Sequence, residues 1–199
     1  AAGQKTGFFL DQRPNRELAG RLAGGAERML NAFAYSGGFS VYGVRGGARR
    51  VVSVDISERA TALARENLAR NGLTEAAHPV LTADVFAYLR ETDETFDLIV
   101  LDPPAFARSR KDLTRAARAY KDVNLQAMRR LRPGGLLMTF SCSNPLEEDL
   151  FDKICLGAAR DASRTVQVLA RLGPGADHPT DLGHPEGRYL KGLLLCMRD

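Results

Sequence analysis

Two adjacent glycines and an acidic residue further along the chain have the types and spacing to bind the adenosine part of a cofactor. The glycines, Gly37 and Gly38, follow the apolar run Leu30–Phe33. They let a ligand approach the backbone closely, at the start of a helix whose N-terminus favours negative charge. Asp55 follows roughly 20 positions later, where a carboxylate can accept hydrogen bonds from both hydroxyls of a ribose. Each feature alone also fits a plain structural turn.

The residues around the glycines indicate which adenosine cofactor is expected. The stretch from Ala34 to Ser40 lacks G-x-G-x-x-G, the pattern that holds a dinucleotide pyrophosphate. S-adenosylmethionine (SAM) has no phosphate, so it is favoured, and a nicotinamide dehydrogenase is disfavoured. Asp84 follows the expected strand His78–Thr82. It could bond the adenine amine, or it could only cap the helix that starts at Val85.

Two further polar motifs follow apolar runs. Asp102-Pro103-Pro104 comes after Phe96–Leu101, and Ser141-Cys142-Ser143 comes after Leu136–Phe140. The prolines fix φ and keep their carbonyls free of a role in the sheet. An aspartate at the end of a buried run could belong to a structural turn, but its neighbours favour a carboxylate that faces a cleft.

The elements that must position these residues alternate between strand and helix. We expect strands at Leu30–Phe33, Arg50–Val54, His78–Thr82, Phe96–Leu101, Leu136–Phe140, Arg164–Leu172 and Tyr189–Met197, and helices at Phe39–Val44, after the Ser57 cap, and at Val85–Leu89, Leu113–Leu131 and Pro145–Ala162. This alternation predicts an α/β fold with a doubly wound, mostly parallel sheet. Ligands bind at the carboxyl ends of the strands in such sheets, so the motifs above should meet at one edge.

Composition places the chain among soluble globular domains. It has 199 residues, of which 44% are hydrophobic and 26% charged, enough for one domain with a full core. No apolar stretch approaches the roughly 20 residues of a membrane span. The three cysteines are too scattered for a disulfide framework or a zinc site, so we expect no metal and a cytoplasmic location. The net charge of +4 permits a polyanionic partner.

Seven segments together resemble one family, the class I SAM-dependent rRNA methyltransferases of the large-subunit, cytosine-C5 type. The segments are Lys5–Arg13, Leu30–Phe39, Val54–Ser57, Leu101–Phe106, Ser141–Ser143, Asp177–Pro179 and Tyr189–Gly192. The resemblance implies a Rossmann-like, mostly parallel seven-stranded sheet with an antiparallel last strand. Full-length members carry an upstream PUA-type RNA-binding domain and a small central domain. Because the chain has no initiator Met, we expect residues 1–199 to be the catalytic domain alone.

The same resemblance implies a set of SAM contacts and a partner. The partner is RNA, rRNA in particular, and a homodimer is compatible with it. The implied cofactor-binding residues are Thr6, Phe8, Asp11, Arg13, Phe33, Tyr35, Ser36, Gly37, Asp55, Ile56, Ser57, Asp84, Val85 and Asp102.

Cytosine-C5 chemistry needs one cysteine at the cleft, and Cys142 is the candidate. A thiolate that adds to C6 turns the ring into an enamine, which can attack the SAM methyl. A helix expected to begin near Pro145 could lower the pKa of the Cys142 thiol. Asp102 would hold the N3/N4 edge of the base. Cys155 and Cys196 are expected to be buried hydrophobic residues.

Several residues near these motifs are candidates for RNA contacts. They are Pro103, Pro104, Phe106, Arg115, Arg118 and His178. The basic run after the Asp-Pro-Pro motif could equally be a solvated helix face. Two other functions stay open. Asp-Pro-Pro-Ala-Phe also resembles the motif of adenine-N6 methyltransferases, and the fold could serve a non-catalytic RNA-binding module.

Overall fold

The computed structural model describes residues 8–183, 187 and 189–199. Its seven strands are β1 (Arg28–Ala32), β2 (Arg50–Asp55), β3 (Val80–Thr82), β4 (Phe96–Leu101), β5 (Leu131–Ser141), β6 (Val166–Leu172) and β7 (Lys191–Met197). They form one sheet in the order β3-β2-β1-β4-β5-β7-β6. Strands β1 to β5 pair in parallel, whereas β7 is antiparallel to both β5 and β6. The predicted α/β, Rossmann-like fold with an antiparallel last strand is confirmed.

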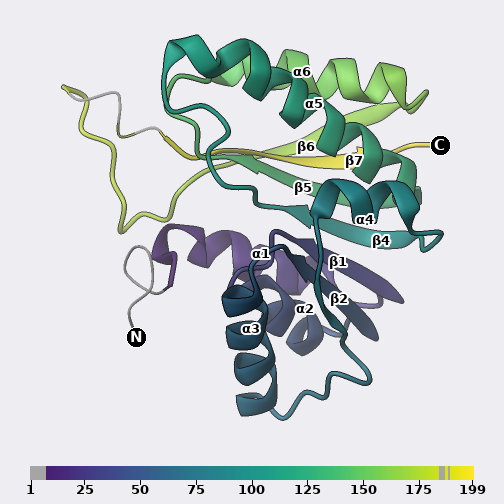
Figure 1. Cartoon of the computed structure of the whole chain (residues 1–199). Helices are drawn as coiled ribbons and strands as arrows, with labels where there is room; N and C mark the ends of the chain where they lie inside the picture. Colours follow the sequence, from purple (N-terminus) through teal and green to yellow (C-terminus); the bar gives the residue numbers. More distant parts are fainter. Residues whose placement is uncertain (1–7, 184–186, 188) are drawn as a thin grey trace.

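Helices cover both faces of this sheet. They are α1 (Arg13–Leu22), α2 (Gly38–Gly46), α3 (Glu58–Arg70), α4 (Val85–Glu91), α5 (Leu113–Arg130) and α6 (Glu148–Asp161), with short 3-10 turns at Leu10–Gln12 and Arg110–Asp112. Helices α1 to α3 lie on one face and α4 to α6 on the other (Figure 1). Neighbouring strand residues alternate between the faces. Met29 packs in the core under α1 and α2, and Leu30 packs in the core under α4 to α6.

Helix α1 was not expected from the sequence. Its ten residues bury two polar side chains, Asn15 and Arg16, together with Ala19 and Gly20. A helix that buries polar and small residues lacks the large apolar stripe by which amphipathic helices are identified. Pro14 stands in its first turn, a position where proline is well tolerated.

Two boundaries near Cys142 differ from the expected ones. Strand β5 begins at Leu131, because the chain stays in the sheet through the Pro-Gly-Gly segment, with a register shift against β4. Helix α6 begins at Glu148 instead of near Pro145. A turn precedes it, in which the Leu146 amide donates to the Ser143 carbonyl at 3.1 Å. The start of the helix therefore lies beyond the first turn after Cys142.

Candidate functional site

The carboxyl ends of the central strands lie side by side, as the parallel topology requires. Ala32 at the end of β1 pairs with Val54 of β2 and Leu101 of β4. Asp55 ends β2 and fixes the loop that follows β1, because its carboxylate accepts from the Tyr35 amide at 2.9 Å. Its other oxygen accepts from the Ser57 amide, also at 2.9 Å. Each carboxylate oxygen retains a lone pair for a further donor such as a ribose hydroxyl.

The loop after β1 has an unusual backbone. Phe33 and Tyr35 have φ values of 61° and 45°, in the left-handed region that non-glycine residues seldom occupy, and Gly37 follows with φ of 75°. Each such non-glycine residue costs on the order of 1–3 kcal/mol and persists only where its surroundings hold it. The Asn67 side chain donates to the Ser36 carbonyl at 2.8 Å and helps to hold this loop. Strain of this kind clusters at functional sites.

This loop forms one wall of a cleft of about 400 Å³. The residues that line it are Phe8, Phe9, Arg16, Phe33, Ala34, Tyr35, Ser36, Gly38, Phe39 and Asp102. Five of them are predicted cofactor-binding residues: Phe8, Phe33, Tyr35, Ser36 and Asp102.

Arg16 of α1 is the charged residue of this cleft that sequence reasoning missed. It is 3% exposed, and its guanidinium stacks over the Phe8 ring at 4.1 Å. Nη1 donates to the Phe9 carbonyl at 2.7 Å, but Nε and Nη2 are buried without a hydrogen-bond partner. Burial lowers the pKa of Arg16. Two unsatisfied donors on a buried cation favour an anionic group in the cleft, such as a carboxylate.

Asp102 sits at the other side of the cleft, held by a chain of amides. Gln12 Nε2 donates to Asp102 Oδ1 at 3.0 Å. The side-chain oxygen of Gln12, Oε1, accepts from Asn15 Nδ2 at 2.6 Å. Asn15 also donates to the Gly173 carbonyl at 2.9 Å. Burial raises the pKa of Asp102 from 3.8 to about 7, although the Gln12 hydrogen bond opposes that rise. At neutral pH the carboxyl is therefore partly protonated and can donate as well as accept.

Asp11 and Arg13, both predicted to contact SAM, connect the N-terminal segment to the last third of the chain. Asp11 accepts from the Tyr189 hydroxyl at 2.6 Å. Arg13 pairs with Asp177 at 2.9 Å, and His178 lies 3.3 Å from the same carboxylate. These contacts join the N-terminal segment to two segments of the last third of the chain.

Cys142 lies on a turn that is tied to the Asp-Pro-Pro loop. Its Sγ is directed at the Pro103 carbonyl, 3.8 Å away. The neighbouring Ser143 is fully buried and bonds the Tyr120 hydroxyl at 2.9 Å and the Ala107 amide at 3.1 Å. These bonds join β5, α5 and the loop after β4. The structure therefore brings together the two motifs that carry the predicted catalytic residues, Cys142 and Asp102.

The other cysteines differ from Cys142 in their surroundings. Cys155 is buried in α6, as predicted, and burial raises the pKa of its thiol. Cys196 was expected to be buried, but it is only half-buried, although its neighbours in β7, Leu195 and Met197, are buried.

The remaining predicted cofactor residues lie around the ends of β2 and β3. Ile56 is 68% exposed, although it is large and apolar, while Val85 is buried. Ser57 and Asp84 act as helix caps and accept from the Ala60 and Ala87 amides at 3.3 and 2.9 Å. Thr6 lies outside the described residues.

The predicted RNA-contact residues lie in two different environments. Phe106 belongs to an aromatic cluster and lies 4.6 Å from Tyr120 between ring centroids, whereas Pro103 is buried and Pro104 exposed. Arg115 and Arg118 are both exposed on α5, and Arg115 pairs with Asp112 at 3.3 Å.

The described residues contain no group of three or more His, Cys, Asp or Glu residues that could hold a metal ion. Among the described helices, none combines the length and apolar character needed to cross a membrane.

Residues 1–188 match the family described as S-adenosylmethionine-dependent methyltransferase. The chain belongs to this family. SAM is thus its cofactor, as the glycine turn and Asp55 predicted.

Ribosomal RNA large subunit methyltransferase I of Aeromonas hydrophila is 49% identical over an alignment of 199 positions, which covers 98% of this chain and 50% of that protein. The protein of the same name from Tolumonas auensis is 50% identical over 196 residues, 97% of this chain and 49% of the relative. The chain spans about half the length of these relatives.

Solved structures agree with this family membership. SMU.776, described as a methyltransferase and crystallised with S-adenosylhomocysteine, has a TM-score of 0.84 at 30% identity, over 98% of this chain and 51% of that one. The N-methyltransferase NodS of Bradyrhizobium japonicum has a TM-score of 0.64 at 16% identity, over 94% of this chain and 97% of that one. The second likeness concerns the fold alone.

Proposed function

We propose that this SAM-dependent methyltransferase acts on C5 of a cytosine in large-subunit rRNA, with Cys142 as the nucleophile. The observation that carries the proposal is the hydrogen-bonded junction of the Cys142 turn with the Asp102 loop, beside the cleft after β1. The names of the relatives from Aeromonas hydrophila and Tolumonas auensis support large-subunit rRNA as the substrate.

The cleft and the adjoining end of β2 have the features that SAM requires. Asp55 offers acceptors for the two ribose hydroxyls, and the exposed Ile56 offers an apolar surface to the adenine ring. The unsatisfied donors of Arg16 fit the carboxylate of the methionine part. When bound, SAM supplies an electrophilic methyl group. A carboxylate bound there would give these buried donors the partner that they lack.

Cys142 and Asp102 then divide the chemistry on the base. The thiolate forms a bond from sulfur to C6, and the electron pair of the C5–C6 double bond moves toward C4 and N3. The neutral carboxyl of Asp102 can give its proton to N3, since its pKa of about 7 keeps much of it protonated at neutral pH. C5 becomes nucleophilic and takes the methyl group. A base then takes the C5 proton, which re-forms the C5–C6 double bond and expels the thiolate, and N3 returns its proton to the Asp102 carboxylate.

The test uses an RNA fragment in which 5-fluorocytosine replaces cytosine. Fluorine at C5 cannot leave as a proton, so the adduct on Cys142 cannot resolve. With SAM present, we expect a protein–RNA crosslink that survives denaturing gel electrophoresis. Cys142→Ala should abolish both the crosslink and methylation of ordinary RNA, whereas SAM affinity should stay within about twofold because the thiol serves the base.

Two matched variants control for the loss of a thiol. Cys155→Ala and Cys196→Ala should still crosslink, with stability lost only through small cavities. If Cys142→Ala methylates RNA at the wild-type rate, Cys142 is not the nucleophile. If the product is N6-methyladenine, the amino-methyltransferase alternative replaces the proposal.

A further inference from the structure

Lys191 is buried beside the turn that carries Cys142. It begins β7 and pairs with Ser141 of β5 in the antiparallel register. The residue is 5% exposed, and its ammonium donates to the Ser143 carbonyl at 3.0 Å. Lys191 therefore contacts the residues on both sides of Cys142 in the chain, one through the backbone pairing and the other through its side chain.

Charged and titratable groups reach Cys142 from three elements. Tyr120 comes from α5, Tyr189 lies just before β7, and Lys191 begins β7. Burial raises the pKa of Tyr120 and Tyr189, and negative charge on Cys142 adds to both rises. For Lys191, burial lowers the pKa while negative charge on Cys142 opposes that effect. Of these three groups, only Lys191 can carry a positive charge.

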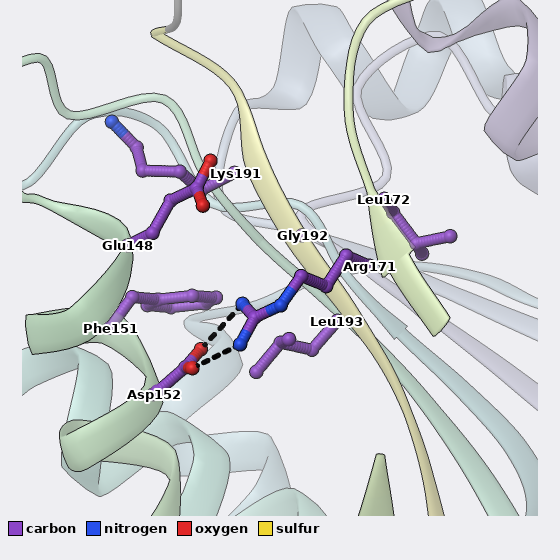
Figure 2. Close-up of a pocket in the computed structure, with 8 residues that line it drawn as sticks. All are labelled: Glu148, Phe151, Asp152, Arg171, Leu172, Lys191, Gly192 and Leu193. Carbon is purple, nitrogen blue, oxygen red and sulfur yellow. Dashed lines mark hydrogen bonds and ion pairs between the residues drawn. The ribbon is translucent and has the colours of Figure 1, made fainter. Parts of the chain in front are cut away.

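Glu148 of α6 is a second negatively charged group near Lys191. Both residues line a small hollow of about 220 Å³ between α6 and the ends of β6 and β7, and Figure 2 shows their side chains there. In the same hollow Arg171 is paired with Asp152 at 2.5 Å, so that cation is already neutralised. The negative charge of Glu148 also favours the charged form of Lys191.

The sequence predicts a second source of positive potential at Cys142, the N-terminus of the following helix. That helix starts too far along the chain to act on Cys142. Helix α6 starts at Glu148, beyond the turn that follows Cys142. The favourable field of a helix N-terminus falls off within its first turn. The first turn of α6 also carries the acidic side chains of Glu148 and Asp149, which offset that field.

We propose that Lys191 is a positioning residue whose ammonium holds Cys142 in the thiolate form. This inference rests on the proposed role of Cys142. A buried ammonium is costly unless an anion offsets its desolvation, and the Ser143 carbonyl supplies only a dipole. A thiolate at Cys142 supplies the larger share of that negative charge and Glu148 the smaller, so the ammonium and the thiolate stabilise each other.

The test follows the alkylation of Cys142 by iodoacetamide across pH, read by mass spectrometry of the peptide that contains it. Only the thiolate reacts, so the midpoint of the rate profile reports the pKa of that one thiol. Lys191→Met keeps the length of the side chain and removes the charge. We expect its midpoint to rise by about one pH unit, which is a roughly tenfold slower reaction near neutral pH. Lys191→Arg keeps the positive charge, so its midpoint should lie close to that of the wild type.

Lys153→Met is the matched control, because it removes one exposed lysine of α6 and changes the net charge equally. Its profile should equal that of the wild type. An unchanged midpoint in Lys191→Met would overturn the proposal. So would a wild-type midpoint no lower than that of Cys142 in the urea-unfolded chain, a comparison that does not depend on the variant folding.

Alkylation needs neither RNA nor SAM, so this inference and the proposed function can fail separately. If the protein gives no crosslink with 5-fluorocytosine RNA but the midpoint of Cys142 alkylation rises in Lys191→Met, the proposed function is contradicted and the Lys191–Cys142 pair is kept. If the protein crosslinks but the alkylation midpoint is the same in Lys191→Met and the wild type, only the role of Lys191 is contradicted.

Discussion

Asp102 has an environment that suits a proton carrier better than a structural turn. Its carboxyl receives one amide hydrogen bond from Gln12, faces the buried guanidinium of Arg16, and still has a pKa near 7 because burial outweighs both. A carboxyl in a turn that faced solvent would stay ionised above about pH 4. The cost of keeping Asp102 in this cleft should therefore be visible in the stability of the fold.

Replacing Asp102 by Asn should reveal this cost as a pH dependence. The folded protein keeps a proton on Asp102 between pH 3.8 and about 7 that the unfolded chain has lost. The stability from the neutral carboxyl is therefore fully present below about pH 4 and is lost as pH rises through 7. Urea unfolding should find Asp102→Asn more stable than the wild type by about 1–3 kcal/mol at pH 8, and equal to it near pH 4. A pH-independent difference would mean that Asp102 titrates normally.

Asp55 should control cofactor affinity. Removing two charge-assisted hydrogen bonds to a ribose costs on the order of 2–3 kcal/mol, so calorimetry on Asp55→Ala should show SAM binding at least tenfold weaker. Asp149→Ala is the matched control, since that carboxylate is exposed on α6 and pairs only with Lys153 among the described contacts. NAD titrated into the wild type should give no heat. An unchanged SAM affinity in a folded Asp55→Ala protein would remove Asp55 from the site.

The sequence predicted the site residues that end strands and missed those that support them. Asp55, Asp102 and Cys142 could be assigned to one edge because parallel strands present their carboxyl ends together. Gln12 and Arg16 could not, because nothing in the sequence marks these two polar residues as buried beside those strand ends. Gln12, for example, bonds a residue 90 positions away.

At the scale of elements, α1 positions one wall of the cleft through its packing on α2. The two helices approach so closely that glycine is required at the crossing. A Cβ built on Gly46 would overlap the Gly20 carbonyl, and one built on Gly20 would lie 3.0 Å from the Tyr42 carbonyl. Backbone atoms cannot move aside as a side chain can. The position of Arg16 on α1 therefore depends on two glycines that have no chemistry of their own.

Gly46→Ala should destabilise the protein by about 1–3 kcal/mol, since it forces the two helix backbones apart. It should also weaken SAM binding, because Arg16 and Phe8 would move with α1. Gly157→Ala in α6 is the control, where the added Cβ would meet only Lys121 Cε at 3.4 Å. Alanine is the better helix former there, so that variant should gain about 0.5–1 kcal/mol. Thermal unfolding of the pair measures both effects, and equal melting temperatures would contradict the close crossing.

The elements themselves were predictable where their patterns were strong. The strands of the central sheet are nearly continuous apolar runs, as buried parallel strands are, and the expected positions of β2 and β4 were confirmed to within one residue. The start of β5 was misplaced because Pro133, Gly134 and Gly135 are typical turn residues. In the fold they extend the strand, with a register shift that accommodates Gly134 at φ of 76°.

At the scale of the whole molecule, the net charge of +4 is small, so local clusters decide where a polyanion could bind. One such cluster follows the Asp-Pro-Pro loop, on the turn before α5 and its first two turns, near the edge that holds Cys142. Its exposed residues are Arg108, Arg110, Lys111, Arg115 and Arg118. Side chains of this type neutralise phosphates without reading the bases, so they would give affinity and little sequence preference.

Changing Arg115 and Arg118 together to Ala should therefore weaken RNA binding about equally for unrelated sequences. Each lost phosphate contact on single-stranded RNA reduces the slope of log K against log salt by about 0.7, so the pair should flatten it by up to about 1.4. Arg49 and Arg70 form the matched control, since both are well exposed, pair with Glu27 and Glu66, and lie toward the amino ends of the strands, opposite the cleft. Their double Ala variant has the same net charge and should keep the wild-type slope. Equal effects from the two pairs would show that overall charge is responsible. A changed sequence preference at an unchanged slope would show that Arg115 and Arg118 contact bases.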